Sequence, residues 1–180
     1  MTLILIIRTR QGGGGNHISF IPSIGVLGTS TVADMALSSI LVIHGPNLNL
    51  LGTREPEVYG TTTLADHIAS VGAAASAHGV SVADVQSNAE QEIVATIHAA
   101  IGKHDGIIIN AGAFTHYSWA IHDALKSFPG HIVEVHLSNP GAREGFRHVS
   151  VLAPVVSGTI SGFGGLGYAL AVEALVELAH

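Results

Sequence analysis

Short apolar runs alternate with longer alanine-rich segments from about residue 40 to the end of the chain. The runs are rich in Val and Ile and favour buried strands at 40–44, 80–86, 106–110, 132–137 and 154–160. The segments between them have the apolar period of helices, which we expect at 64–78, 90–103, 116–128 and 166–178. Repeated β-α units predict the α/β class, as a flavodoxin-like three-layer sandwich with a five-stranded parallel sheet.

The first part of the chain lies outside this pattern. A glycine-rich stretch, QGGGGN at 11–16, separates the opening residues from the rest. We therefore interpret residues 1–38 as an amino-terminal extension, flexible or not native, and residues 39–180 as a single α/β domain. An alternative that stays open is that the natural chain starts at Met35.

Composition narrows the possible partners. Charged residues make up only 11% of the 180 residues, which suggests that subunit interfaces cover part of the surface. The net charge of -6 argues against nucleic acid as a partner, because it would repel a phosphate backbone. The chain has no cysteine and therefore no disulfide, which is compatible with a cytoplasmic enzyme. The uncharged segment 149–172 is broken by Pro154 and several glycines, so we expect no membrane span.

Polar groups follow three of the expected strands. The first strand leads into a long loop at 44–60 that holds Arg54 and Tyr59, the third into Asn110, and the fourth into His136 and Ser138. A loop of this length is usually functional or disordered, although a solvated Arg54 and a packed Tyr59 on a surface lid would also explain it. The carboxyl ends of parallel strands share one edge of a sheet, where we expect the ligand site.

Six motifs in order resemble the type II dehydroquinase family. The resemblance as a whole covers residues 39 to the carboxyl terminus. The motifs are GPNLNLLG at 45–52 with REP and YG up to Gly60, QSNAE at 86–90, NAGAFTH at 110–116, DAL at 123–125, EVHLSN at 134–139, and the segment from Arg143 to the Gly-rich turn before Tyr168. The resemblance implies dehydration of 3-dehydroquinate to 3-dehydroshikimate, by anti elimination through an enolate. It implies no metal and no cofactor, and a pathway that is either shikimate synthesis or quinate catabolism.

The resemblance also implies roles for individual residues. Tyr59 becomes the base, Arg54 the cation that favours its phenolate form, and His136 the general acid for the leaving hydroxyl. Asn47 is implied to hold a water or donor at the enolate oxygen, and Asn110 to position the leaving hydroxyl. The remaining implied substrate contacts are Leu137, Ser138, His116, Arg147 and Asp123. A free tyrosine titrates near pH ~10, so a neighbouring arginine is the group that this chemistry needs.

Asp123 raises a question of assembly. His116 and Asp123 lie seven residues apart on one expected helix, which separates them by about 10 Å. That distance is long for one small ring, so Asp123 is the candidate to reach a neighbouring subunit's site. A dodecamer built from trimers, which the family implies, would allow this.

The residues support other functions less well. The string GFGGLG at 162–167 has the form of a dinucleotide fingerprint, but no strand or acidic ribose ligand follows it, and we interpret it as a tight turn before the last helix. A Schiff-base mechanism would need Lys103 or Lys126, both on expected helices. Most histidines, His67 included, are expected on helix surfaces. A non-catalytic flavodoxin-like binding module remains the alternative of a different class.

Overall fold

The computed structural model describes residues 37–180, so the start at Met35 and nearly all of the predicted extension lie outside the described part. Its strands are β1 (Ser39–His44), β2 (Ser81–Gln86), β3 (Gly106–Asn110), β4 (His131–His136) and β5 (Gly158–Ser161). Its α-helices are α1 (Pro56–Tyr59), α2 (Leu64–Ala77), α3 (Glu90–Ala100), α4 (Trp119–Lys126) and α5 (Leu166–Leu178). Short 3-10 helices occupy several of the connections.

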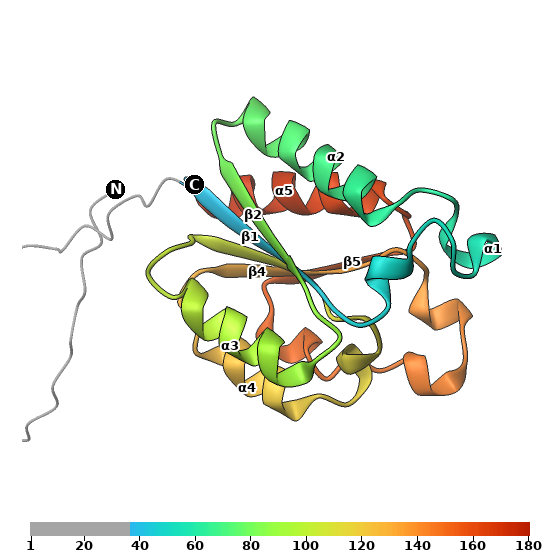
Figure 1. The fold of residues 1–180 in the computed structure, drawn as a ribbon. Helices are drawn as coiled ribbons and strands as arrows, with labels where there is room; N and C mark the ends of the chain where they lie inside the picture. Colours follow the sequence, from blue (N-terminus) through green and yellow to red (C-terminus); the bar gives the residue numbers. More distant parts are fainter. Residues whose placement is uncertain (1–36) are drawn as a thin grey trace, which may run out of the picture. The chain divides into compact units, whose positions relative to one another are not determined.

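All strands of the sheet are parallel, in the order β2-β1-β3-β4-β5. Helices α2 and α5 cover one face, and α3 and α4 cover the other (Figure 1). The predicted three-layer flavodoxin-like sandwich is thus confirmed. The chain reverses its direction of travel across the sheet between β1 and β3, so the ends of these two strands form the switch point at which ligands of such folds bind.

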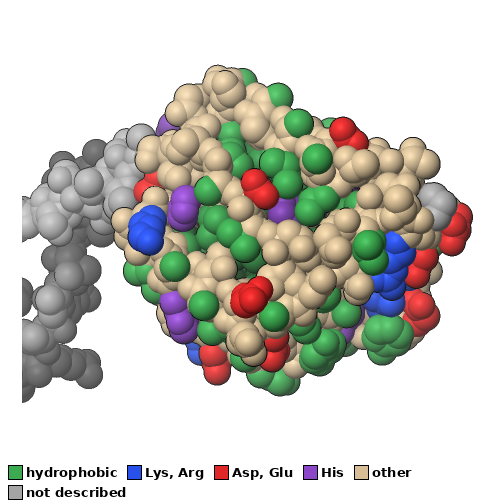
Figure 2. Space-filling model, viewed as in Figure 1, with side chains coloured by type: hydrophobic (Ala, Val, Ile, Leu, Met, Phe, Trp, Pro, Cys, Tyr) green, Lys and Arg blue, Asp and Glu red, His purple; other side chains and the backbone are tan. Residues whose placement is uncertain are grey.

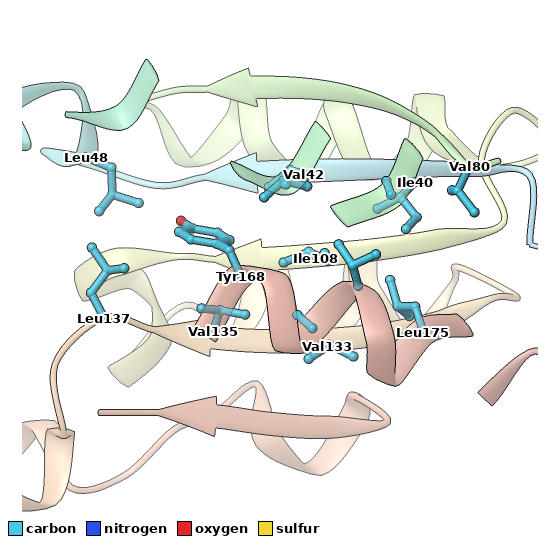
Figure 3. Close-up of a cluster of buried hydrophobic side chains, with 14 of the residues drawn as sticks. Ile40, Val42, Leu48, Val80, Ile108, Val133, Val135, Leu137, Tyr168 and Leu175 are labelled. Carbon is cyan, nitrogen blue, oxygen red and sulfur yellow. The ribbon is translucent and has the colours of Figure 1, made fainter. Parts of the chain in front are cut away.

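Two apolar layers explain why consecutive residues in the middle of β1 and β3 are apolar. Ile40, Val42 and Ile108 pack toward α2 and α5, in the layer that Figure 3 shows together with Tyr168. The alternate residues, such as Ile43 and Ile107, pack toward α3 and α4. Successive side chains of a strand point to opposite faces, so a strand covered on both sides needs apolar residues throughout.

Two expected elements differ most from the structure in their boundaries. The strand expected at 154–160 begins only at Gly158, and Pro154 lies in a 3-10 helix, Ala153–Val155. Proline has no N–H to donate to a sheet, which accounts for the late start. The helix expected at 116–128 is a 3-10 helix, Gly112–His116, followed by α4. The break is at Ser118, whose side chain caps α4 by accepting from the Ile121 N–H.

The Gly-rich segment before α5 forms the close turn expected of it. Gly162 has a φ of 86°, which a residue with a side chain rarely adopts. A Cβ on Gly165 would lie 2.5 Å from the His67 ring, and one on Gly167 would touch Val135 and Ile160. The start of α5 is therefore held close to both the sheet and α2.

The described surface carries few charges. The face in Figure 2 is mostly apolar and uncharged polar, and the largest blue group on it lies at the right, where Figure 1 places α1. The most exposed large apolar side chains are Tyr117, Trp119, Phe146, Val149, Phe163 and Leu166. Within residues 37–180, no helix combines the length and apolar character that crossing a bilayer requires.

Candidate active site

A cavity of about 100 Å³ lies beyond the carboxyl ends of β1, β3 and β4, at the predicted edge of the sheet. Asp123 is the one candidate site residue that does not line it. The candidates that do are Asn47, Arg54, Tyr59, Asn110, His116, His136, Leu137, Ser138 and Arg147. Three stretches far apart in the sequence therefore supply one pocket.

The loop after β1 is held at both of its sides. The Gly45 N–H donates to the Asn110 carbonyl at 2.7 Å, and a Cβ on Gly45 would lie 2.4 Å from the Ala111 backbone, so only glycine allows this approach. Asn47 adopts a left-handed φ of 67°, and its N–H donates to the Asn88 side chain. Leu48 is buried in the layer of α2 and α5. These contacts place the Asn47 side chain at the pocket wall.

Tyr59, at the end of α1, meets a cation that the sequence did not single out for a role. Arg143 donates from Nη1 to the Tyr59 hydroxyl at 3.2 Å, and its guanidinium carbon lies 5.7 Å from the centre of the tyrosine ring. The hydrogen bond to Tyr59 raises the pKa of Arg143, so the guanidinium stays charged. Arg54 pairs instead with Glu55, at 3.6 Å. A charged donor at this position can stabilise negative charge that develops on the hydroxyl oxygen during a reaction.

His136, the last residue of β4, is paired with a buried carboxylate. Its Nε2 lies 3.0 Å from Oε1 of Glu134, a side chain with no exposed surface. Ser150 donates to the same carboxylate at 2.9 Å, and Thr159 does so at 3.3 Å. The sequence holds a signal for this pair, because residues two apart on a strand point to the same face.

The geometry leaves one nitrogen of His136 for a ligand. A carboxylate accepts, so Nε2 carries the hydrogen in this pair, and Nδ1 has no partner among the described residues. The neighbouring carboxylate also stabilises the charged ring. The pair can therefore hold a proton on Nδ1 and deliver it into the pocket.

A second polar group lies below the pocket, on the side of α5. The Asn110 side chain accepts from the Gly112 N–H at 3.3 Å and donates from Nδ2 to the Tyr168 hydroxyl at 3.3 Å. That hydroxyl also lies 2.9 Å from Nδ1 of His44. His67, expected on a helix surface, is instead only 5% exposed and lies against Tyr168, so that prediction is wrong. The close turn at Gly165 encloses the His67 ring.

His44 is expected to make the fold sensitive to acid. Burial, aided by the nearby His67, lowers the pKa of His44 from 6.5 to about 4. Between these values the unfolded chain binds a proton that the folded chain does not, so stability is full above pH 6.5 and falls as the pH is lowered toward 4. The shift corresponds to roughly 3 kcal/mol.

Urea unfolding of the wild type and of His44→Asn at pH ~7 and at pH ~4.5 measures this contribution. We expect the wild type to lose about 2 to 3 kcal/mol more than the variant on acidification. Equal losses would show that His44 titrates normally in the folded protein.

The remaining candidates take other positions. His116 bonds through Nδ1 to the Val149 carbonyl, and Arg147 pairs with Glu144 at 2.8 Å. Asp123 is exposed on α4. The prediction that His116 and Asp123 lie on one helix is wrong, because His116 ends a separate 3-10 helix and Asp123 lies in α4. Among residues 37–180, no three His, Cys, Asp or Glu side chains are grouped as metal ligands.

Comparison with known proteins identifies relatives of this chain. The model of the family described as Dehydroquinase class II matches residues 38–176. The 3-dehydroquinate dehydratase of Ruegeria pomeroyi is 59% identical over 139 residues, which are 77% of this chain and 93% of that protein. The 3-dehydroquinate dehydratase of a Nostoc species is 56% identical over 138 residues, covering 77% of this chain and 94% of the relative.

Solved structures extend the comparison to three dimensions. The type II dehydroquinase of Propionibacterium acnes superposes with a TM-score of 0.75 at 43% identity, and covers 78% of this chain and 97% of that one. A 3-dehydroquinate dehydratase-like protein from Bifidobacterium longum gives a TM-score of 0.61 at 31% identity, covering 80% and 99%. With the family match over most of its length, this chain belongs to the class II dehydroquinases.

Proposed function

We propose that the protein is a hydro-lyase, a type II 3-dehydroquinate dehydratase that converts 3-dehydroquinate to 3-dehydroshikimate. The observation that carries the proposal is that one pocket contains two supported groups. Tyr59 is hydrogen-bonded to Arg143, and His136 is paired with Glu134. A base and an acid that line the same pocket are the two groups that the proposed anti elimination needs. The product serves the shikimate pathway or arises in quinate breakdown.

In the proposed first step, the Tyr59 phenolate removes a proton from the carbon beside the ketone, and an enolate forms. Arg143 favours the phenolate through its hydrogen bond, and Arg54, which lines the same pocket, is the second cation proposed to do so. Asn47 is proposed to hold a water or to donate at the enolate oxygen, where negative charge develops.

In the second step, His136 protonates the departing C1 hydroxyl, which leaves as water while the enolate collapses to the conjugated enone. Asn110 is proposed to hold the leaving oxygen beside His136. At the end of a turnover Tyr59 carries a proton and His136 has lost one, so a proton transfer restores the starting state. No covalent intermediate and no added cofactor enters this scheme.

The other contacts are proposed for recognition. Leu137 and Ser138, just beyond β4, are proposed to bind the substrate carboxylate, and His116 and Arg147 the ring hydroxyls. The support for this is that all four residues line the cavity. Asp123 lies outside the pocket of its own chain, and we propose that it serves the site of a neighbouring subunit. The homo-oligomer proposed for this is a dodecamer built from trimers.

Arg143→Gln is expected to lower kcat about thirtyfold. The substitution removes the positive charge that lies next to the Tyr59 hydroxyl. Two close unit charges at an effective dielectric of ~20 interact by up to about 4 kcal/mol. Because Arg143 is partly exposed, solvent screening reduces this to about 2 kcal/mol. Steady-state kinetics measure the effect. Lys103→Gln, which removes an exposed charge far from the pocket, is the matched control and should leave kcat unchanged. Equal effects of the two variants would exclude a specific role for Arg143.

The proposed function is tested with the purified full-length protein and 3-dehydroquinate, by following the ultraviolet absorbance of the conjugated enone. Separate samples receive a chelator or borohydride. We expect turnover in all samples, because the scheme uses neither a metal ion nor a lysine Schiff base. Loss of activity with borohydride would refute the proposed chemistry, and no turnover by folded protein would favour a binding module.

A further inference from the structure

The polar group formed by His44, Asn110 and Tyr168 lies under the pocket and is almost closed to solvent. Their exposed fractions are 0%, 4% and 0%. Figure 3 shows the Tyr168 ring between α5 and the sheet, with its hydroxyl oxygen turned toward the strand ends where Leu48 and Leu137 lie. Of the three, only Asn110 lines the pocket. The other two can influence the reaction only through it.

The direction of each hydrogen bond in this group follows from one backbone donor. The Gly112 N–H can only donate, so it fixes the oxygen of the Asn110 amide on its own side. The amide nitrogen therefore faces Tyr168 and donates to the hydroxyl oxygen. The hydroxyl hydrogen is left with one acceptor, Nδ1 of His44. His44 must then be neutral, with its hydrogen on Nε2.

We propose that Tyr168 and His44 are positioning residues, which form a relay that fixes the orientation of the Asn110 amide in the pocket. An amide nitrogen has two hydrogens, and one is used by Tyr168. The other is the donor that Asn110 offers to the leaving oxygen. The inference rests on the proposed role of Asn110.

Removing the acceptor at His44 would favour the opposite orientation of the Asn110 amide. The Tyr168 hydroxyl could then donate only to the amide oxygen, so the amide would have to flip. The amide nitrogen would then face the Gly112 N–H, and two donors would meet. The low pKa of His44, about 4, agrees with a ring that stays an acceptor at neutral pH.

The first test is Tyr168→Phe, which keeps the buried ring and removes the hydroxyl. We expect kcat to fall about tenfold, the equivalent of one hydrogen bond, with a change in KM of less than about twofold. The loss falls on kcat because the donor matters most as the leaving oxygen gains charge. Tyr117→Phe, at an exposed hydroxyl, is the matched control and should match the wild type. A wild-type kcat in Tyr168→Phe would overturn the relay.

The second test varies the acceptor. His44→Asn can present Oδ1 where Nδ1 stood, whereas His44→Leu has no acceptor. We expect His44→Asn to keep most of kcat and His44→Leu to lose about as much as Tyr168→Phe. An equal loss in both would show that packing, not hydrogen-bond direction, is what His44 supplies. Circular dichroism and thermal unfolding identify any variant that fails to fold, and Tyr168→Phe then carries the test alone.

A double-variant cycle separates this inference from the function on which it rests. If Tyr168 acts through Asn110, Tyr168→Phe costs nothing further in an Asn110→Ala protein. If Tyr168→Phe still lowered kcat tenfold in the Asn110→Ala protein, the relay would be overturned and the proposed function would be left intact. A wild-type kcat in Asn110→Ala would refute the role of Asn110, and the relay with it.

Discussion

Replacing Tyr59 with Phe is expected to lower kcat by at least about 10³-fold, because general bases contribute on the order of 10² to 10⁴ and the scheme has no substitute for this one. The partly buried ring and its contact with the Arg143 guanidinium do not depend on the hydroxyl, so the fold should survive. KM should change much less than kcat, since proton removal is a property of the transition state.

The measurement is steady-state turnover of 3-dehydroquinate, beside the matched control Tyr117→Phe. The Tyr117 hydroxyl belongs to an exposed side chain outside the pocket, so the control removes the same atom at no catalytic cost. A further readout is exchange of the proton beside the ketone with deuterated solvent, which should stop in Tyr59→Phe. Exchange at the wild-type rate would show that another group is the base.

The fold could be predicted because its strongest signal is local. The middle of β1 and of β3 is a continuous run of Ile, Leu and Val, which is typical of parallel strands covered on both faces. The errors arose where one residue overrode the pattern. Pro154 delays β5, and Ser118 caps α4 two residues after the 3-10 helix that holds His116. The serine cap was a readable signal, since an N-cap serine commonly marks a helix start.

The site could be predicted only in part. A general rule brings Asn110 and His136 together, because they end neighbouring strands. The contact of Arg143 with Tyr59 depends on how the turns after β4 fold. Asn139 and Pro140 are typical of a turn, and a 3-10 helix does begin there, but a local turn pattern does not say that Arg143 meets Tyr59, 84 residues away in the sequence. The burial of His67 likewise depends on the approach of Gly165, which is distant in the sequence.

Glu134→Gln is expected to lower kcat about 10³-fold, although this side chain does not line the cavity. The substitution keeps the shape and removes the charge that stabilises a protonated His136. When the amide oxygen faces Nε2, the neutral ring keeps its single hydrogen on Nε2. Without the negative charge, the second proton, on Nδ1, loses its stabilising partner, and this is the proton that the leaving hydroxyl needs.

Glu173→Gln is the matched control, because Glu173 also pairs with a histidine, His78, at 2.9 Å, but on the surface. It should leave kcat unchanged, since an exposed pair contributes little and lies outside the pocket. A wild-type kcat in Glu134→Gln would show that His136 does not depend on Glu134 for its proton.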